Sequence, residues 1–161
     1  MAAVTSLGDD VFVVRWVTQQ QVEVYDAVSC TLQRHITVQG LGEYTYGLAA
    51  CAHYKCLYIS DPTRYRGSLQ RAELSGSNAV KTWSVAEDPR GVSVNRAHNV
   101  VVACRGALQE YTTHGSLVRE ICLQADVTRP WHAVQLSSGD YVVKTGHVTG
   151  CDQCSWSRRT S

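Results

Sequence analysis

The chain has 161 residues and a formal net charge of +1, with 18% charged and 44% hydrophobic residues. This hydrophobic content excludes intrinsic disorder, and the near-zero charge gives no general attraction toward nucleic acids or anionic membranes. No apolar run approaches the about 18 residues of a membrane-spanning helix. Asp9 and Asp10 interrupt the N-terminus before any signal-like apolar core. We therefore expect a cytoplasmic protein with no membrane contact.

Short apolar or alternating runs separated by turn residues start near the N-terminus and predict β-strands. In the first part of the chain these runs cover residues 10–14, 22–26 and 30–38. They correspond to strands two to four of a unit that lacks most of its first strand. No long run has helical spacing, so we predict an all-β fold.

The rest of the chain repeats this pattern. The predicted strands are 47–51, 57–61, 68–74 and 80–85 in the second unit, 91–95, 100–104, 107–111 and 117–123 in the third, and 132–136 and 141–145 in the fourth. A period of about 40–45 residues with four strands per unit is typical of β-propeller blades. We predict a β-propeller fragment of about three and a half four-stranded antiparallel blades over residues 1–145. A disordered or irregular tail is expected over residues 146–161.

The hydrophobic pattern changes along each unit. Second strands are apolar on both faces, whereas third and fourth strands alternate and should have one wet face. This gradient predicts sheets stacked face to face in sequence order, with second strands nearer the axis than fourth strands. Since propellers have about 4–8 blades, we expect a fragment or an open partial ring. Its two terminal blades would expose apolar faces and favour self-association.

One blade carries a family resemblance. Pro-Arg-Gly-Val-Ser-Val-Asn at residues 89–95 is followed by Asn-Val-Val-Val-Ala-Cys at 99–104 and Leu-Gln-Glu-Tyr at 108–111. This order resembles an NHL-repeat blade, and Tyr-Ile-Ser-Asp at 58–61 matches the family's Tyr-Val-Ala-Asp. Cys104 and Thr145 replace the family's second-strand Asp. The resemblance implies protein binding, as in tripartite-motif ubiquitin-ligase scaffolds, and in some members single-stranded RNA binding. No zinc-ring spacing of Cys and His occurs in this chain.

Arginine and aromatic residues recur in the loops that precede each first strand, which we term the lead-in loops. In a propeller these loops meet at one end of the central channel, although they lie about 40 residues apart. The candidate binding residues are Tyr44, Tyr46, Arg90, Arg129, Trp131 and His132. Arginine beside Tyr or Trp suits stacking and the capture of a carboxylate or phosphate. The alternative is that Tyr46 and Trp131 only pack between blades.

We expect these side chains to cluster, partly exposed, at one end of the stacked blades. Arg105, which follows a second strand, is expected on the opposite rim. The loop at residues 62–67 is a second binding candidate, because it presents Arg64, Tyr65 and Arg66. The alternative for this loop is a solvated connection without a ligand.

Seven cysteines with irregular spacing do not form a disulfide framework. Most fall inside predicted strands, where we expect buried, reduced thiols, namely Cys30, Cys51, Cys56, Cys104 and Cys122. A disulfide between Cys51 and Cys56 across one hairpin is the alternative. His147, Cys151 and Cys154 have the one metal-like spacing, but zinc requires more ligands than this segment offers. We therefore expect no metal site.

Catalytic signatures are missing from the sequence. No Gly-x-Ser-x-Gly elbow or phosphate-binding glycine loop occurs, so we expect no catalytic residues, no cofactor and no enzymatic activity. The leading hypothesis is a protein-interaction module that presents its propeller loops to a protein partner. The alternative is single-stranded RNA binding by Arg64, Arg66, Arg90, Arg105 and Arg129 with Tyr65 and Trp131. A metal-dependent enzyme with histidines in the channel, such as His132, is the third hypothesis.

Overall fold

The structure is a computed structural model that describes residues 2–15, 21–41, 47–62, 67–74, 80–86, 88–127, 129–146 and 153–157. These residues form fifteen strands and no helix, and therefore none long and apolar enough to cross a membrane. Sheet 1 contains β1 (Ala2–Leu7), β2 (Asp10–Arg15), β3 (Gln21–Asp26) and β4 (Leu32–Thr37), and sheet 2 contains β5 (Gly47–Cys51), β6 (Cys56–Asp61), β7 (Ser68–Glu73) and β8 (Val80–Ser84). Sheet 3 contains β9 (Val92–Val94), β10 (Val100–Cys104), β11 (Ala107–Tyr111) and β12 (Leu117–Cys122), and sheet 4 contains β13 (Pro130–Gln135), β14 (Tyr141–Thr145) and β15 (Gln153–Ser157).

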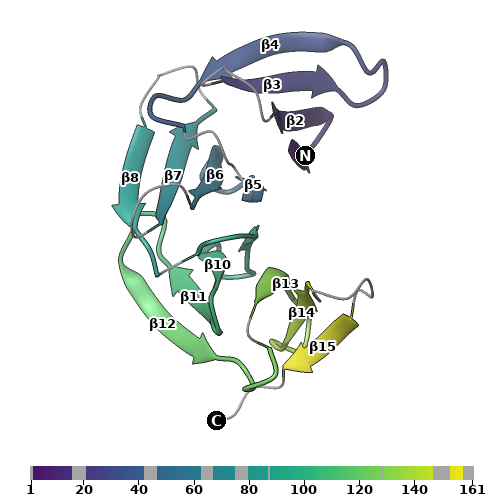
Figure 1. Cartoon of the computed structure of the whole chain (residues 1–161). Coiled ribbons are helices and arrows are strands. Elements are labelled where there is room, and N and C mark those ends of the chain that lie inside the picture. Colours follow the sequence, from purple (N-terminus) through teal and green to yellow (C-terminus); the bar gives the residue numbers. More distant parts are fainter. Residues whose placement is uncertain are drawn as a thin grey trace.

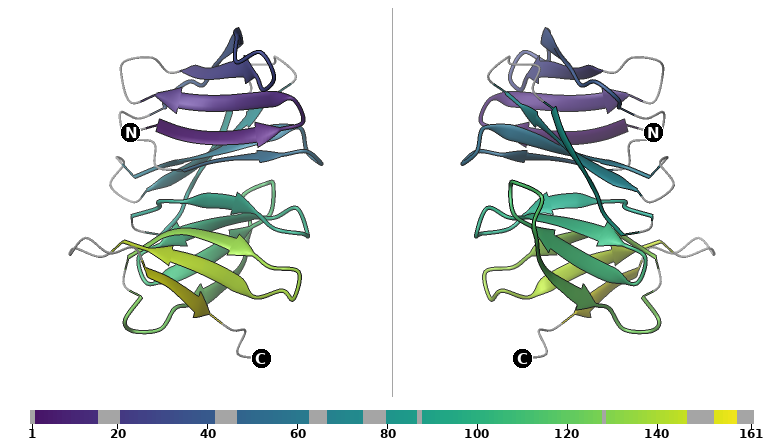
Figure 2. Two further views of the ribbon diagram at one scale, coloured as in Figure 1. Left: turned by 90° about the vertical axis from the view of Figure 1, so that its right-hand side faces the viewer. Right: turned by 90° about the vertical axis from the view of Figure 1, so that its left-hand side faces the viewer.

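Each sheet is a simple meander in which every strand pairs antiparallel with its neighbour in sequence. The four sheets follow one another around an arc, with β4, β8 and β12 on its outer side (Figure 1). First strands of neighbouring sheets contact each other, β1 with β5, β5 with β9 and β9 with β13, which places them on the inner side. Seen from the side, the sheets are stacked in chain order (Figure 2). The predicted all-β, blade-like architecture is thus confirmed.

The hydrophobic core consists of three clusters, each between two consecutive sheets. Phe12, Val22 and Val24 of sheet 1 pack against Leu57 and Ile59 of sheet 2. A second cluster joins sheets 2 and 3, and a third joins sheets 3 and 4. A sheet covered on both faces should be apolar on both faces, and all residues of β6 and β10 are buried. The outer strands β4, β8 and β12 are mostly exposed.

The third strands differ from the expectation of one wet face. Gln70 on β7 and Gln109 and Glu110 on β11 are buried between sheets. Hydrogen bonds to other segments compensate for much of this burial: the Gln70 Nε2 donates to the Gly40 carbonyl at 2.8 Å, although its Oε1 has no hydrogen-bond partner, and the Gln109 Oε1 accepts from the Ala86 N–H at 2.9 Å. A buried polar group is tolerated when it has such partners, so alternation in sequence overestimated the solvent exposure of these strands.

Two segments were assigned wrongly from sequence. Residues 2–7 form β1, which supplies the first strand that the first unit was expected to lack. A two-residue turn closes its hairpin with β2, and Gly8 adopts the positive φ of 58° that such turns favour. Within the expected irregular tail, residues 153–157 form β15, which pairs along the whole of β14. A ladder of this kind satisfies the backbone of β14, whichever side chains the added strand carries.

Candidate functional site

Arg90 in the lead-in loop of sheet 3 contacts Trp131, which lies inside the first strand of sheet 4, β13, and not in the loop before it as expected. The Arg90 guanidinium lies over the Trp131 ring, with its Cζ 4.5 Å from the ring centroid. Two nitrogens of Arg90 donate hydrogen bonds to the Asp88 carboxylate, Nε at 3.1 Å and Nη2 at 2.9 Å. The Arg90 side chain is 15% exposed and that of Asp88 35%. Arg90 is therefore held in a fixed orientation between a carboxylate and an indole, while the residues remain partly open to solvent.

A close backbone approach at Gly91 positions this pair. A Cβ at Gly91 would lie 2.7 Å from the His132 Cα and 2.6 Å from its Nδ1, and would collide with the Trp131 carbonyl. Only glycine therefore allows the lead-in loop of sheet 3 to lie against the start of β13. Gly47 approaches the Arg90 carbonyl and Val92 N in the same way one sheet earlier. The Ser60 hydroxyl donates to the Arg90 carbonyl and anchors the loop from sheet 2.

The other predicted residues fall into two groups. Arg129 is exposed just before β13, and His132 is half-buried within it. Burial, and secondarily the charge of its register partner Lys144, lowers the pKa of His132, so this imidazole stays neutral at neutral pH. The remaining candidates lie outside the described residues and stay predictions: Tyr44, Tyr46, Arg64, Tyr65 and Arg66.

Arg105 lies at the same end as Arg90, and the expectation of an opposite rim is wrong. The Arg90 N–H donates to the Ala103 carbonyl, and the Ala103 N–H donates to the Gly91 carbonyl, both at 2.9 Å. Because β9 and β10 are antiparallel, the end of β10 lies beside the start of β9. The exposed Arg105 thus adds a cation to the lead-in end.

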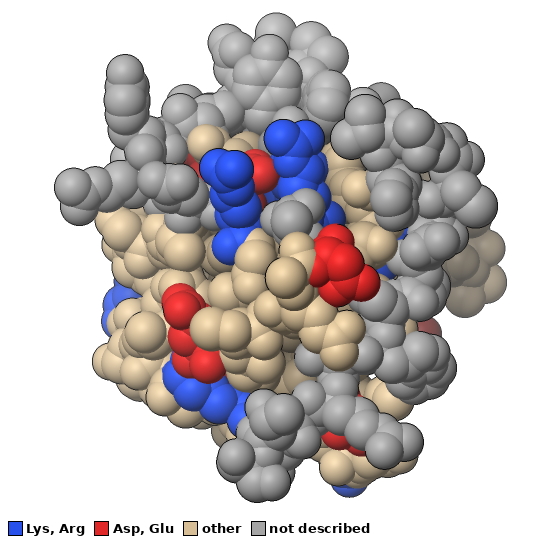
Figure 3. All heavy atoms as spheres, turned by 60° about the horizontal axis from the view of Figure 1, so that its bottom comes forward, with Lys and Arg blue, Asp and Glu red and all other residues tan. Residues whose placement is uncertain are grey.

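Charges on one face of the molecule are mixed. In Figure 3, which brings the bottom of Figure 1 forward, Lys and Arg lie among Asp and Glu and do not form a stripe. Within the described part of the chain, no group of three or more His, Cys, Asp or Glu residues could hold a metal ion. The sequence also contained one metal-like spacing, at His147, Cys151 and Cys154. His147 and Cys151 lie outside the described residues, and the side chain of Cys154 is not described.

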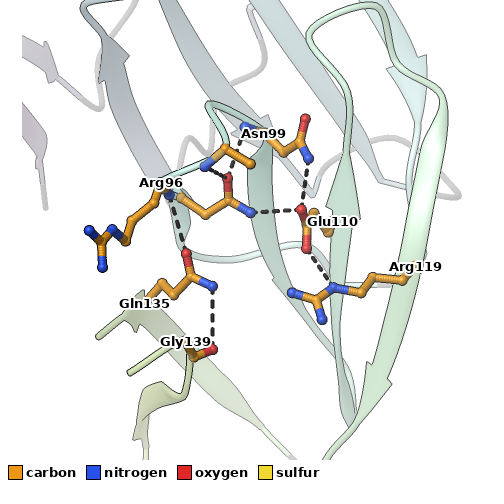
Figure 4. Close-up of polar contacts among 8 residues, drawn as sticks. Arg96, Asn99, Glu110, Arg119, Gln135 and Gly139 are labelled. Carbon is orange, nitrogen blue, oxygen red and sulfur yellow. Dashed lines mark hydrogen bonds and ion pairs between the residues drawn. The ribbon is translucent and has the colours of Figure 1, made fainter. Parts of the chain in front are cut away.

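A polar network at the other end of sheet 3 was missed from sequence (Figure 4). The buried Glu110 carboxylate accepts from Asn95 Nδ2 at 2.7 Å, from Asn99 Nδ2 at 2.8 Å and from Arg119 Nε at 2.6 Å. Burial by itself would raise the pKa of Glu110, but the donors Asn99, Arg119 and Asn95 outweigh it and lower the pKa. The sequence signal was the adjacent polar pair Gln109 and Glu110 in a short third strand whose other residues are Ala, Leu and Tyr.

This network also reaches sheet 4. Gln135 Oε1 accepts from the Arg96 N–H at 3.2 Å, and the Arg96 guanidinium donates to the Ser137 carbonyl at 2.9 Å. The Asn95–Asn99 turn is thereby tied to the next sheet. Nearby on the surface, the rings of His53 and His98 are stacked 4.1 Å apart. These contacts stabilise the packing of neighbouring sheets and give the two ends of the stack different chemistry.

The cysteines depart in part from the expected buried set. Cys51 and Cys56 are register partners on the β5–β6 hairpin, and both are buried free thiols without a disulfide. Cys104 is also buried, and burial, with the charge of Glu120, raises its pKa to about 12. In contrast, Cys30 and Cys122 are exposed. Cys30 lies in the turn before β4 with a φ of 55°, so it is outside the strand in which it was placed.

Comparison with solved structures supports the fold. Hydrazine synthase of Kuenenia stuttgartiensis matches with a TM-score of 0.72 and 18% identity over 92% of this chain and 42% of that chain. The WD40 β-propeller domain of Doa1 matches with a TM-score of 0.68 and 14% identity over 90% of this chain and 47% of that one. The chain has a β-propeller fold. A protein of unknown function from Bacteroides caccae matches with a TM-score of 0.60 and 13% identity, over 90% and 52% of the two chains.

These identities are low, so the matches establish the fold alone. The propeller chain described here spans about half the length of the solved proteins that it matches. No protein-family model and no curated protein matches the sequence.

Proposed function

We propose that this propeller is a non-enzymatic protein-interaction module of the NHL-like type, which binds a peptide segment of a cytoplasmic partner at its lead-in end. The observation that carries this proposal is the Arg90–Trp131 pair, which joins the lead-in loop of sheet 3 to the first strand of sheet 4. Arginine and tryptophan are the residue types that contribute most to binding at protein interfaces.

The geometry suits a partner with a carboxylate or an aromatic side chain. Arg90 is oriented by Asp88 before any ligand arrives, which reduces the entropy lost on binding. Arg129 and Arg105 add exposed positive charge at the same end. Since the neighbouring His132 has a lowered pKa, it contributes a neutral imidazole at neutral pH.

Single-stranded RNA binding, the second hypothesis from sequence, has weaker support. Sequence-tolerant binding of single strands requires a positively charged groove with stacking aromatics. On the face drawn in Figure 3, Lys and Arg instead lie among Asp and Glu and do not form the continuous basic track that a single strand requires.

The test is a selection of phage-displayed random peptides on the immobilised protein, followed by anisotropy measurements with the enriched peptides. Arg90→Ala and Trp131→Ala should each weaken binding at least tenfold, as expected for central interface residues. Lys81→Ala, an exposed change on the outer strand β8, should not affect binding. Loss of thermal stability in both variants without selective loss of peptide binding would contradict the proposal. Tighter, salt-sensitive binding of labelled oligouridylate than of any peptide would favour RNA instead.

A further inference from the structure

The same sheet-to-sheet contact occurs three times in this chain. We call the face of a sheet toward the preceding sheet its upstream face, and the other its downstream face. Phe12, Val22 and Val24 on the downstream face of sheet 1 meet Leu57 and Ile59 on the upstream face of sheet 2. The contacts between sheets 2 and 3 and between sheets 3 and 4 have the same order. In each of these contacts, the downstream face of one sheet therefore packs against the upstream face of the next.

The upstream face of sheet 1 carries an apolar patch beside Glu23, which pairs with Val13 in the register, and no other described sheet covers it. Along β1 to β3, side chains that alternate with the buried Phe12, Val22 and Val24 lie on this face. The register pairs Val4 with Val13 and Val11 with Tyr25 there. Val4 is 63% exposed. A groove of about 350 Å³ is lined by Val11, Val13, Tyr25, Asp26, Ala27 and Cys30.

The downstream face of sheet 4 is apolar at its centre as well. Ala133 and Val143 are register partners that face sheet 3. Their neighbours Val134 and Val142 are also register partners, and alternation places them on the opposite face. Val134 is 48% exposed. The downstream face of sheet 4 therefore carries the apolar side chains of Val134 and Val142, and no other sheet of the described residues covers it.

We propose that the upstream face of sheet 1 binds the downstream face of sheet 4 of a second copy of this chain. The two free faces occupy the same places in the repeat as the pairs of faces that the chain already packs together three times, so they should pack in the same way. The contact is heterologous, because two different faces meet. Such contacts form a closed ring if the rotation between copies closes, and an open assembly if it does not.

The repeated contact itself favours a second copy as the occupant, because a copy of this chain carries the matching downstream face in its sheet 4. Exposed apolar side chains such as Val4 on an uncovered sheet face also mark an interaction site in a folded protein.

The experiment uses one variant for each face. Val4→Asp alters the upstream face of sheet 1, and Val134→Asp alters the downstream face of sheet 4. Val118→Asp is a matched control, since Val118 is also 48% exposed but lies on β12 of an internal sheet. The mass of each protein is measured by sedimentation velocity over a hundredfold range of concentration, and its folding is checked by circular dichroism. If Val4→Asp fails to fold, Val13→Asp replaces it on the same face.

Wild type and Val118→Asp should increase in mass with concentration, whereas Val4→Asp and Val134→Asp should each remain monomeric. An equimolar mixture of the last two should form a heterodimer and nothing larger, because each retains the face that the other lacks. A wild type that stays monomeric throughout would overturn the proposal. So would a mixture that stays monomeric, or a Val134→Asp variant that still forms homodimers, which would indicate contact between two identical faces.

Discussion

Glu110→Gln tests the role of the buried carboxylate that joins β11 to the Asn95–Asn99 turn and to β12. The replacement has nearly the same shape but no charge. Its carbonyl can still accept from Asn95 and Asn99, which share one Glu110 oxygen. The new amide then faces the Arg119 Nε–H, where a donor meets a donor and the 2.6 Å bond is lost.

The expected cost follows from this one lost bond. A hydrogen bond between charged partners contributes about 1.5–3 kcal/mol. Because the Arg119 side chain is 33% exposed, water replaces part of the interaction and the lower part of that range applies. We expect the free energy of unfolding to fall by about 2 kcal/mol, which corresponds to about 4–8 °C in melting temperature for a domain of this size.

The effect should depend on pH in a defined direction. The pKa of Glu110 is lowered in the folded protein from its ordinary value of 4.5. A carboxyl group with a lowered pKa stabilises the fold fully above its ordinary pKa, and this contribution is lost as the pH falls through the folded value. The difference between wild type and Glu110→Gln should therefore be constant near neutral pH and shrink below about pH 4.5.

Urea denaturation followed by far-ultraviolet circular dichroism, repeated across this pH range, measures the difference. Asp126→Asn is the control, because Asp126 is exposed in the turn before β13 and its change should cost less than about 0.5 kcal/mol. Equal stabilities of wild type and Glu110→Gln at neutral pH would refute the reasoning. A difference that persists unchanged in acid would show that packing, not the carboxylate charge, is responsible.

Two further predictions concern backbone approach and thiol exposure. Gly91→Ala should cost about 3 kcal/mol in thermal or urea unfolding, because its methyl group would overlap the start of β13. Gly106→Ala, where a Cβ meets nothing within 4 Å, should cost only about 1 kcal/mol for its positive φ; equal losses would contradict the close approach. Brief treatment of the native protein with N-ethylmaleimide, followed by peptide mass mapping, should modify Cys30 and Cys122 and leave Cys51, Cys56 and Cys104 unmodified until urea is added. Rapid native modification of Cys104 would disprove its burial.

Exposed apolar faces at both ends of the stack and an Arg–Trp pair at one rim give this propeller two separate surfaces. Peptide binding at the lead-in loops would leave the faces of sheets 1 and 4 free. Assembly through those faces would in turn leave Arg90 and Trp131 accessible, because the two lie between sheets 3 and 4 at the end of the strands. The two proposals can therefore fail or succeed independently.

The sequence by itself determined the fold class, the unit length and most strand positions. Alternation and turn residues act over a few neighbours, so a run such as Val100–Cys104 identifies a second strand without knowledge of its partners. Two strands were not predicted from these local patterns. β1 and β15 are defined by the ladders that they complete with β2 and β14, and not by a strong pattern of their own.

Only the tertiary structure decided which distant side chains meet. Arg90 and Trp131 each belong to a different sheet, and their contact depends on the close approach at Gly91. The burial of Gln70 and Glu110 likewise depends on donors and acceptors supplied by other segments, which no local pattern reveals. The side on which Arg105 lies follows from antiparallel pairing of β9 with β10. Local periodicity is sufficient to predict strands. The candidate site depends on how the sheets pack, because its contacts join residues that are far apart in sequence.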